Sequence, residues 1–152
     1  MIHKLKHSCF AFLTLLFLAN IAFGDELISI DNYLKKNNFN DPIVKLNTYD
    51  QCSGLILMLL GETKHKKMPV KFSPLMENGY VDVTKATIYL IGHSFKDPAS
   101  VERKEEFNMN RLVKLYVQYA KSLEIAGRNK FDDPLINSDL KSCIKIIKEA
   151  KK

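Results

Sequence analysis

The sequence predicts an all-α fold: a small domain of four or five helices, with one disulfide bond between the second and the last helix. Three observations support this prediction. Apolar residues recur every three to four positions along most of the chain. The pairs Asp41-Pro42 and Asp97-Pro98, which are typical of helix starts, stand directly before two of these apolar runs. No segment shows a convincing alternation of apolar and polar residues, so we expect no strand.

The first 24 residues have the order of a secretory signal peptide, which would be removed before the rest of the chain folds. The features are a basic start, an apolar run and two small residues at cleavage spacing: Lys4 and Lys6, Cys9 to Leu18, and Ala22 and Gly24. Residues 25–152 are then expected to form a single helical domain. This predicts an exported protein, periplasmic if the source is a Gram-negative bacterium and otherwise secreted.

The first two helices are expected in residues 25–61. Apolar residues at three-to-four spacing predict a short amphipathic helix over 25–39, ending at Asn37-Asn38. Asp41-Pro42 then opens a second helix, because Asp can cap it and Pro suits its first position. We expect Gly61 to end this helix. Leu55 to Leu60 are apolar on every face, which places the second helix at the centre of the core.

A long connecting loop and a third helix are expected next. Residues 61–80 contain two Gly and two Pro, and this pattern predicts a loop that is longer than usual. Val81 to Ile91 has the spacing of a helix with Asp82 as its cap, although its β-branched residues leave a strand open. A second break follows at residues 95–98.

The strongest helical pattern runs from Pro98 to Ala126 and contains no further Pro and no Gly, with Gly127 directly after it. Its first turns are charged on almost every face, so they either project into water or lie at an interface. Its apolar stripe consists of Met109, Leu112, Val113, Tyr116, Tyr119, Ala120 and Leu123. After Asp132-Asp133-Pro134, we expect a last helix from about Ser138 to Ala150.

Removal of the signal peptide would leave two of the three cysteines in the chain. Cys9 leaves with the signal, so Cys52 and Cys143 remain as a pair in an oxidising compartment. Both fall on inward-facing positions of predicted helices, which favours one disulfide bond. The bond would close a loop of about 90 residues and contribute roughly 4–5 kcal/mol. Two buried free thiols are the alternative, and a redox-active pair is a weaker one because the spacing is not Cys-x-x-Cys.

The charge of the chain argues against nucleic acid as a partner. The net charge of +6 falls to +4 when Lys4 and Lys6 are removed, and this is too small an excess for nucleic-acid binding. The best candidate contact surface is a basic loop that could meet an acidic protein or an anionic surface: Lys64, His65, Lys66, Lys67 and Lys71. Such an attraction would be weak and salt-sensitive. A loop that serves only solubility is the simpler interpretation.

The chain contains no convincing catalytic or metal-binding motif. Gly92-His93-Ser94-Phe95-Lys96 begins like a nucleophile elbow but lacks the glycine that the tight turn requires. A helix end followed by a polar turn is the better interpretation of this segment. His65 with Met58, Met68 and Met76 suggests soft-metal ligands, but the neighbouring lysines would repel a cation. We therefore predict no catalytic residue, no metal and no cofactor.

These observations favour a non-enzymatic binding or interaction protein, with a chaperone-like module as one form of it, whose partner is another protein or an anionic surface. A homodimer built on the half-polar long helix stays open, and stable membrane insertion is not expected after cleavage. One alternative is a carrier of a small apolar ligand, with a cavity near Leu55 to Leu60 and Leu112 to Leu123. A weaker one is a hydrolase that uses Glu102, Glu106 or His93 in a cleft.

Overall fold

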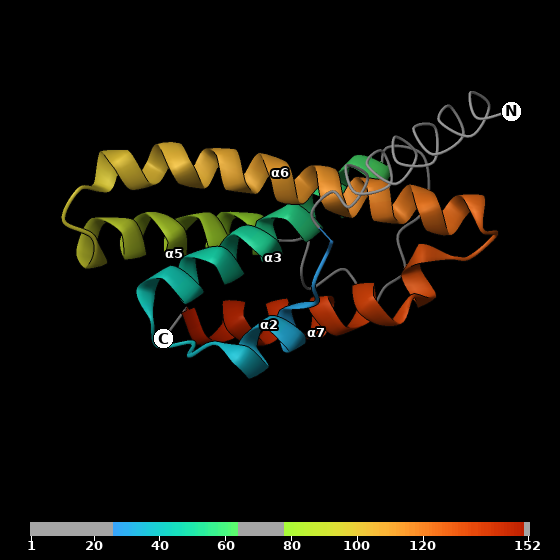
Figure 1. Cartoon of the computed structure of the whole chain (residues 1–152), viewed down its shortest axis with the longest axis horizontal. Coiled ribbons are helices and arrows are strands. Elements are labelled where there is room, and N and C mark those ends of the chain that lie inside the picture. Colours follow the sequence, from blue (N-terminus) through green and yellow to red (C-terminus); the bar gives the residue numbers. More distant parts are fainter. Residues whose placement is uncertain (1–25, 64–77, 151–152) are drawn as a thin grey trace, which may run out of the picture.

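The computed structural model describes residues 26–63 and 78–150, and within these ranges every regular element is a helix (Figure 1). The all-α prediction is therefore confirmed. The elements are α2 (Ile30–Lys36), α3 (Pro42–Thr63), α5 (Gly79–Ser94), α6 (Pro98–Ile125), the short 3₁₀ helix η2 (Lys130–Asp132) and α7 (Pro134–Ala150). The predicted signal peptide, residues 1–24, lies outside the described residues.

The helices are arranged around α3, which packs against each of the other four (Figure 1). Helix α6 covers one side of α3, α5 lies beside it, and α7 with the short α2 covers the opposite side. Helices α3 and α6 run in the same direction, whereas α5 and α7 run in the opposite one. Because α3 is enclosed in this way, it carries the largest share of the buried core, as its apolar last turns predict.

The core draws side chains from all five helices. Its buried members are Ile30, Tyr49, Cys52, Leu55, Ile56, Met58, Leu59, Val83, Tyr116, Ala120, Leu123, Ile136, Leu140, Cys143, Ile146 and Ile147. The stripe predicted for the long helix supplies Tyr116, Ala120 and Leu123, and these face α3 as expected. Burial of this continuous apolar set is the main favourable contribution to folding.

The predicted disulfide bond is present between Cys52 of α3 and Cys143 of α7. Both residues are fully buried, and their Cα atoms lie 5.5 Å apart. The bond joins residues 91 positions apart in sequence. It therefore ties the last helix to the central one, and the prediction of a bond between the second and the last helix is confirmed.

Three Asp-Pro pairs start three of the helices. Asp41 Oδ1 accepts the backbone N–H of Ile43 at 2.8 Å, and Asp97 caps α6 in the same way. Asp133 does so for α7, which begins at Pro134 and not at Ser138 as the sequence analysis expected. The expectation was four residues late, although the third Asp-Pro pair has the same cap chemistry as the other two.

Other helix boundaries also differ from the expectation. Helix α2 covers only Ile30–Lys36 of the predicted 25–39, and it ends at Asn37 as expected. Helix α3 continues through Gly61 to Thr63, and α5 begins at Gly79 and passes through Gly92 to Ser94. Glycine inside a helix costs about 1 kcal/mol relative to alanine, and packing can offset that cost. Gly127 does end α6, with a φ of 68° that favours glycine.

Helix α6 lies close against α3 at Gly54. A Cβ atom on Gly54 would lie 3.1 Å from the Cβ of Leu112 and 3.3 Å from the backbone N of Val113. The absence of a side chain at this position therefore allows the two helices to come together. One turn earlier on α3, this crossing brings Asp50 against the first half of α6.

Candidate functional site

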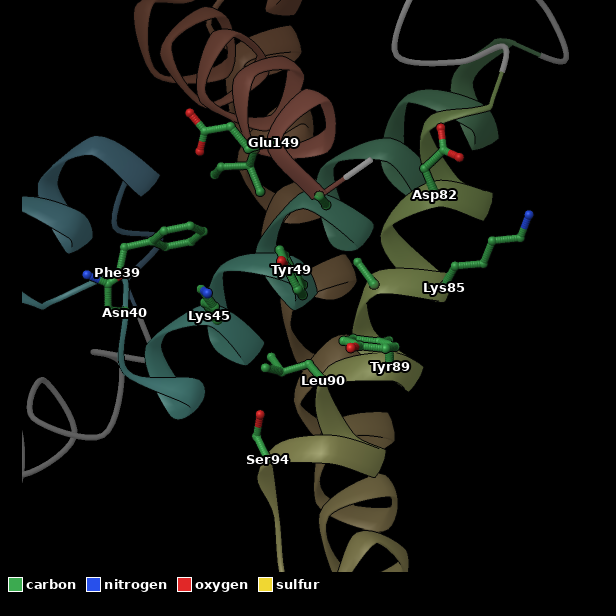
Figure 2. Close-up of a pocket in the computed structure, with 13 residues that line it drawn as sticks. Phe39, Asn40, Lys45, Tyr49, Asp82, Lys85, Tyr89, Leu90, Ser94 and Glu149 are labelled. Atoms are coloured by element: carbon green, nitrogen blue, oxygen red, sulfur yellow. The ribbon is translucent and has the colours of Figure 1, made fainter. Parts of the chain in front are cut away.

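A groove of about 800 Å³ lies between the start of α3, one face of α5 and the end of α7 (Figure 2). We call it the α3/α5/α7 groove. It has the size of a small-molecule or peptide site. The groove is lined by Phe39, Asn40, Lys45, Tyr49, Asp82, Lys85, Ala86, Tyr89, Leu90, Ser94, Ile146, Glu149 and Ala150.

Tyr49 forms the floor of the groove, near the centre of Figure 2. Its ring belongs to the buried core, and only 8% of the residue is exposed. Burial raises the pKa of the Tyr49 hydroxyl, and the negative charge of Glu149 raises it further. The hydroxyl is therefore neutral at physiological pH and can serve as a hydrogen-bond donor or acceptor.

Two more aromatic rings form the sides of the groove. Phe39 follows α2, and the Nζ atom of Lys45 lies 5.6 Å from the centre of its ring, which is a cation–π contact. Tyr89 lies on α5 and is 66% exposed. Its ring stacks on His93 one turn later, with 3.9 Å between ring centres, and His93 Nδ1 lies 2.8 Å from the Tyr89 carbonyl oxygen. The stacking holds the exposed Tyr89 ring in place.

The charged groups of the groove are of both signs. Two lysines and two carboxylates line it, Lys45 and Lys85 against Asp82 and Glu149. In Figure 2, Glu149 and Asp82 lie toward one end, and Lys85 extends away from the centre. A groove with aromatic walls and balanced charge suits a ligand that has apolar groups and both charges, and it does not select a simple anion or cation.

A second, smaller cleft of about 360 Å³ lies between the segment before α2 and the facing sides of α3 and α6. We call it the amide cleft, because side-chain amides form much of it. It is lined by Glu26, Leu27, Ile28, Tyr33, Asn47, Gln51, Asn108, Arg111, Leu112 and Leu115. Gln51 donates a hydrogen bond to the carbonyl oxygen of Ile28 at 2.5 Å, which fastens the segment before α2 to α3.

A chain of hydrogen bonds runs from the amide cleft into the interior. Asn47 donates to the hydroxyl of Tyr33 at 3.1 Å and accepts from Asn108 at 3.4 Å. Asn108 also donates to Asp50 Oδ2 at 2.6 Å, and Arg111 donates to the side-chain oxygen of Asn108 at 3.0 Å. Asp50, at the end of this chain, is 1% exposed.

A second buried carboxylate, Asp139 of α7, has a structural role. It accepts the backbone N–H of Ile30 at 2.7 Å and the hydroxyl of Tyr116 at 2.5 Å. Burial raises the pKa of Asp139 to about 6, although both hydrogen bonds act to lower it. Asp31 of α2 accepts from Ser138 and Ser142 of the same helix α7. These bonds dock α2 against α7 and satisfy the buried polar groups between them.

The structure brings together few of the residues that the sequence singled out for chemistry. The basic loop, Lys64, His65, Lys66, Lys67 and Lys71, lies outside the described residues. Glu102, Glu106 and His93 are exposed, and none of the three lines a cleft described above. The geometry therefore gives the hydrolase hypothesis no support. Leu55 to Leu60 line neither cleft, whereas Leu112 lines the amide cleft.

Within residues 26–63 and 78–150, no three His, Cys, Asp or Glu side chains gather in a way that could hold a metal ion. None of the helices there is both long and apolar enough to cross a bilayer.

Sequence reasoning missed both clefts and the buried carboxylate Asp50. The clefts combine residues from three helices, and no local pattern reports such a combination. No local signal marked Asp50, because polar residues such as Asn47 and Gln51 flank it in the sequence. The chain matches no protein-family model, no curated protein and no solved structure.

Proposed function

We propose that this chain is an exported, non-enzymatic binding protein whose α3/α5/α7 groove holds a segment of a partner protein. The observation that supports this most is the groove itself: three aromatic rings, Phe39, Tyr49 and Tyr89, line a cleft of about 800 Å³ at the surface. Aromatic side chains with a polar end are the residues most enriched at protein–protein contacts.

The surface next to the groove also fits a protein partner. Val81 and Ile88 of α5 are 50% and 61% exposed, and they lie on the same helix as Tyr89. Large exposed apolar side chains beside an aromatic cleft are typical of a contact surface. Balanced charge in the groove suits a polypeptide, which offers apolar side chains and charges of both signs within a few residues.

Export is the second part of the proposal. The order of features in residues 1–24 supports it, and the Cys52–Cys143 bond is compatible with it, because disulfide bonds persist mainly in oxidising compartments.

The groove is tested by selecting displayed peptides of about twelve residues against the disulfide-bonded protein and mapping the bound peptide by NMR. We expect the selected peptides to contain an aromatic or branched aliphatic residue, and amide shifts to cluster at Tyr49, Leu90 and Ile146. Replacing Tyr89→Ala is expected to weaken binding about tenfold, the equivalent of roughly 1.4 kcal/mol.

The control variant is Phe107→Ala. Phe107 is an aromatic residue of α6 with 75% exposure, and it lines neither the groove nor the amide cleft. Its removal should leave the affinity unchanged. Equal affinities for the Tyr89→Ala variant and the unmodified protein, or amide shifts confined to another face, would refute the groove as the binding site.

A carrier of a small ligand is the second candidate, and the amide cleft favours it. Leu27, Leu112 and Leu115 line one part of this cleft, and Arg111 and two asparagines line another. The ligand would therefore be small, with an apolar body and a polar end. Native mass spectrometry of the protein purified from its own compartment should then show an added small mass that is lost on denaturation.

A further inference from the structure

Asp50 of α3 and Glu105 of α6 form a pair of carboxyl groups at the contact between the two helices. The Glu105 carboxyl lies within hydrogen-bonding reach of the Asp50 carboxyl. Asp50 is buried and Glu105 is half-buried, so water screens their interaction only in part. Two negative charges in this position would repel each other and would drive the helices apart.

One oxygen of the pair lacks a hydrogen-bond donor. Asp50 Oδ2 accepts from Asn108, but Asp50 Oδ1 is fully buried and has no hydrogen-bond partner among the described residues. Buried polar atoms are almost always satisfied, so this oxygen requires an explanation. A single proton on the pair removes the repulsion and supplies an O–H donor between the two carboxyl groups, as in other close carboxyl pairs.

The surroundings favour a proton over a metal ion. Asn108 directs an N–H group at Asp50, and Arg111 donates to the other end of Asn108, so donors occupy that side of the pair. A hard cation needs several further oxygen ligands, and the described residues supply only the two carboxyl groups in direct reach.

The carboxylates next to the pair act against the loss of its proton, whereas the Arg111 guanidinium contacts Asn108 and is not among the interactions that shift the pKa of Asp50 or Glu105. On α6, Glu102 and Glu106 raise the pKa of Glu105, although burial raises it most. On α2, the Tyr33 phenol reaches the pair only through Asn47 and Asn108. Among the described residues of α5 and α7, none enters the interactions that shift the pKa of Asp50 or Glu105.

We propose that Asp50 and Glu105 share one proton and act as a pH-sensitive latch, which holds the first half of α6 on α3 and releases it when the proton is lost. The pKa of Asp50, which burial raises from 3.8 to about 8, sets the range in which this occurs. Release would separate the first half of α6 from the part of α3 that precedes the close contact at Gly54. It would expose the polar side of α3 to water.

The direction of the pH effect follows from proton linkage. Between about pH 4 and pH 8 the folded protein keeps the proton of the pair, whereas an unfolded chain has released it. Stability therefore falls as the pH rises through this range and is highest at its acidic end.

The first experiment follows the pair directly in the full disulfide-bonded chain. Carbon-13 NMR of the side-chain carboxyls is recorded from pH 4 to pH 10, together with hydrogen exchange of the α6 amides. We expect the Asp50 carboxyl to titrate near pH 8. We also expect protection of the amides in the first half of α6, measured relative to their intrinsic exchange rate at each pH, to fall at least tenfold above that pH. An Asp50 carboxyl that titrates near pH 4 would refute the shared proton.

The second experiment uses variants that keep the shape of the pair and remove its titration. Asp50→Asn and Glu105→Gln can each form a neutral N–H to carboxylate bond, so both should lose the exchange transition above pH 8. Glu106→Gln, at an exposed neighbour on the same helix, should retain the transition but move it to lower pH, because the charge of Glu106 raises the pKa of Glu105. If the Asp50→Asn variant does not fold, the Glu105→Gln variant is sufficient for the test.

Two results would overturn the proposal. One is an unchanged exchange transition in Glu105→Gln, which would place the titrating group elsewhere. The other is a stability at pH 9 that millimolar Ca²⁺ or Mg²⁺ restores and that EDTA removes, which would mean that a cation and not a proton occupies the pair.

Discussion

Three buried carboxylates, Asp133, Asp139 and Asp50, differ in the hydrogen-bond donors that contact their oxygen atoms. Asp133 accepts hydrogen bonds from four donors. These are two backbone N–H groups at the start of α7, the hydroxyl of Tyr119 and the guanidinium of Arg128. Asp139 has two donors, and Asp50 has one donor and one unsatisfied oxygen. The number of donors thus falls from four at Asp133 to two at Asp139 and one at Asp50, and burial raises the pKa of the latter two.

Asp139 yields a prediction about pH. Burial raises its pKa from 3.8 to about 6, so the folded state keeps a proton that the unfolded chain has lost between about pH 4 and pH 6. Stability contributed by this group falls by about 2 kcal/mol as the pH rises through that window. In urea unfolding experiments, Asp139→Asn should reduce the fall in stability between pH 4 and pH 6 to the part that Asp50 contributes.

The test of Asp139 is the change in the free energy of unfolding with pH, and not its value at one pH. The Asn side chain also changes the hydrogen bonds to Ile30 and Tyr116, and this affects stability at every pH. The fall between pH 6 and pH 8, which belongs to Asp50, should persist in Asp139→Asn. A variant whose stability changes with pH as steeply between 4 and 6 as that of the unmodified chain would contradict the assignment.

At the scale of helices, the positions of caps and of close contacts set the architecture. Helix starts follow local chemistry, since each Asp-Pro pair places a cap and a first residue with a suitable φ. Helix ends follow packing more than sequence: α3 passes through Gly61 and α5 passes through Gly92. A glycine ended a helix only at Gly127, where the backbone adopts a positive φ.

Gly54 and Gly92 both lie inside helices, but we predict opposite changes in stability when each is replaced by alanine. Gly54→Ala places a methyl group 3.1 Å from Leu112 and 3.3 Å from the backbone of Val113, so we expect a loss of about 1–3 kcal/mol. Gly92→Ala meets nothing within 4 Å and should gain about 0.5–1 kcal/mol from helix propensity. Urea unfolding of both variants checks this, and a stabilised Gly54→Ala would show that the helices do not cross there.

For the whole molecule, the covalent bond between α3 and α7 closes most of the chain into one loop. Cys52 and Cys143 are 91 residues apart, and a loop of this length restricts the unfolded chain strongly. On the chain-entropy model the bond contributes roughly 4–5 kcal/mol, a large share of the stability of a domain of this size.

The disulfide prediction is tested with the variant Cys52→Ala/Cys143→Ala. We expect it to lose about 2–5 kcal/mol in urea unfolding, and we expect reductant to weaken the unmodified protein alone. Mass spectrometry of the exported chain should show a start at Asp25 and no alkylation of the two cysteines before reduction. Ready alkylation at Cys52 without reductant would refute the bond in the exported protein.

The sequence by itself determined the helical class, the starts of α3 and α6, and the pairing of Cys52 with Cys143. These features depend on spacing, on cap residues and on a cysteine count, and all three are properties of the chain alone. The sequence also contains a signal for the start of α7, since Asp133-Pro134 is the same kind of helix start as Asp41-Pro42.

Only the tertiary structure decided what the helices form together. Tyr49 and Tyr89 share a groove, and Asp50 meets Glu105, because α3 lies against α5 on one side and against α6 on another. Local patterns show which face of a helix is buried but not which helix covers it. That choice depends on the packing of all five helices at once, and so the candidate sites became visible only in the folded chain.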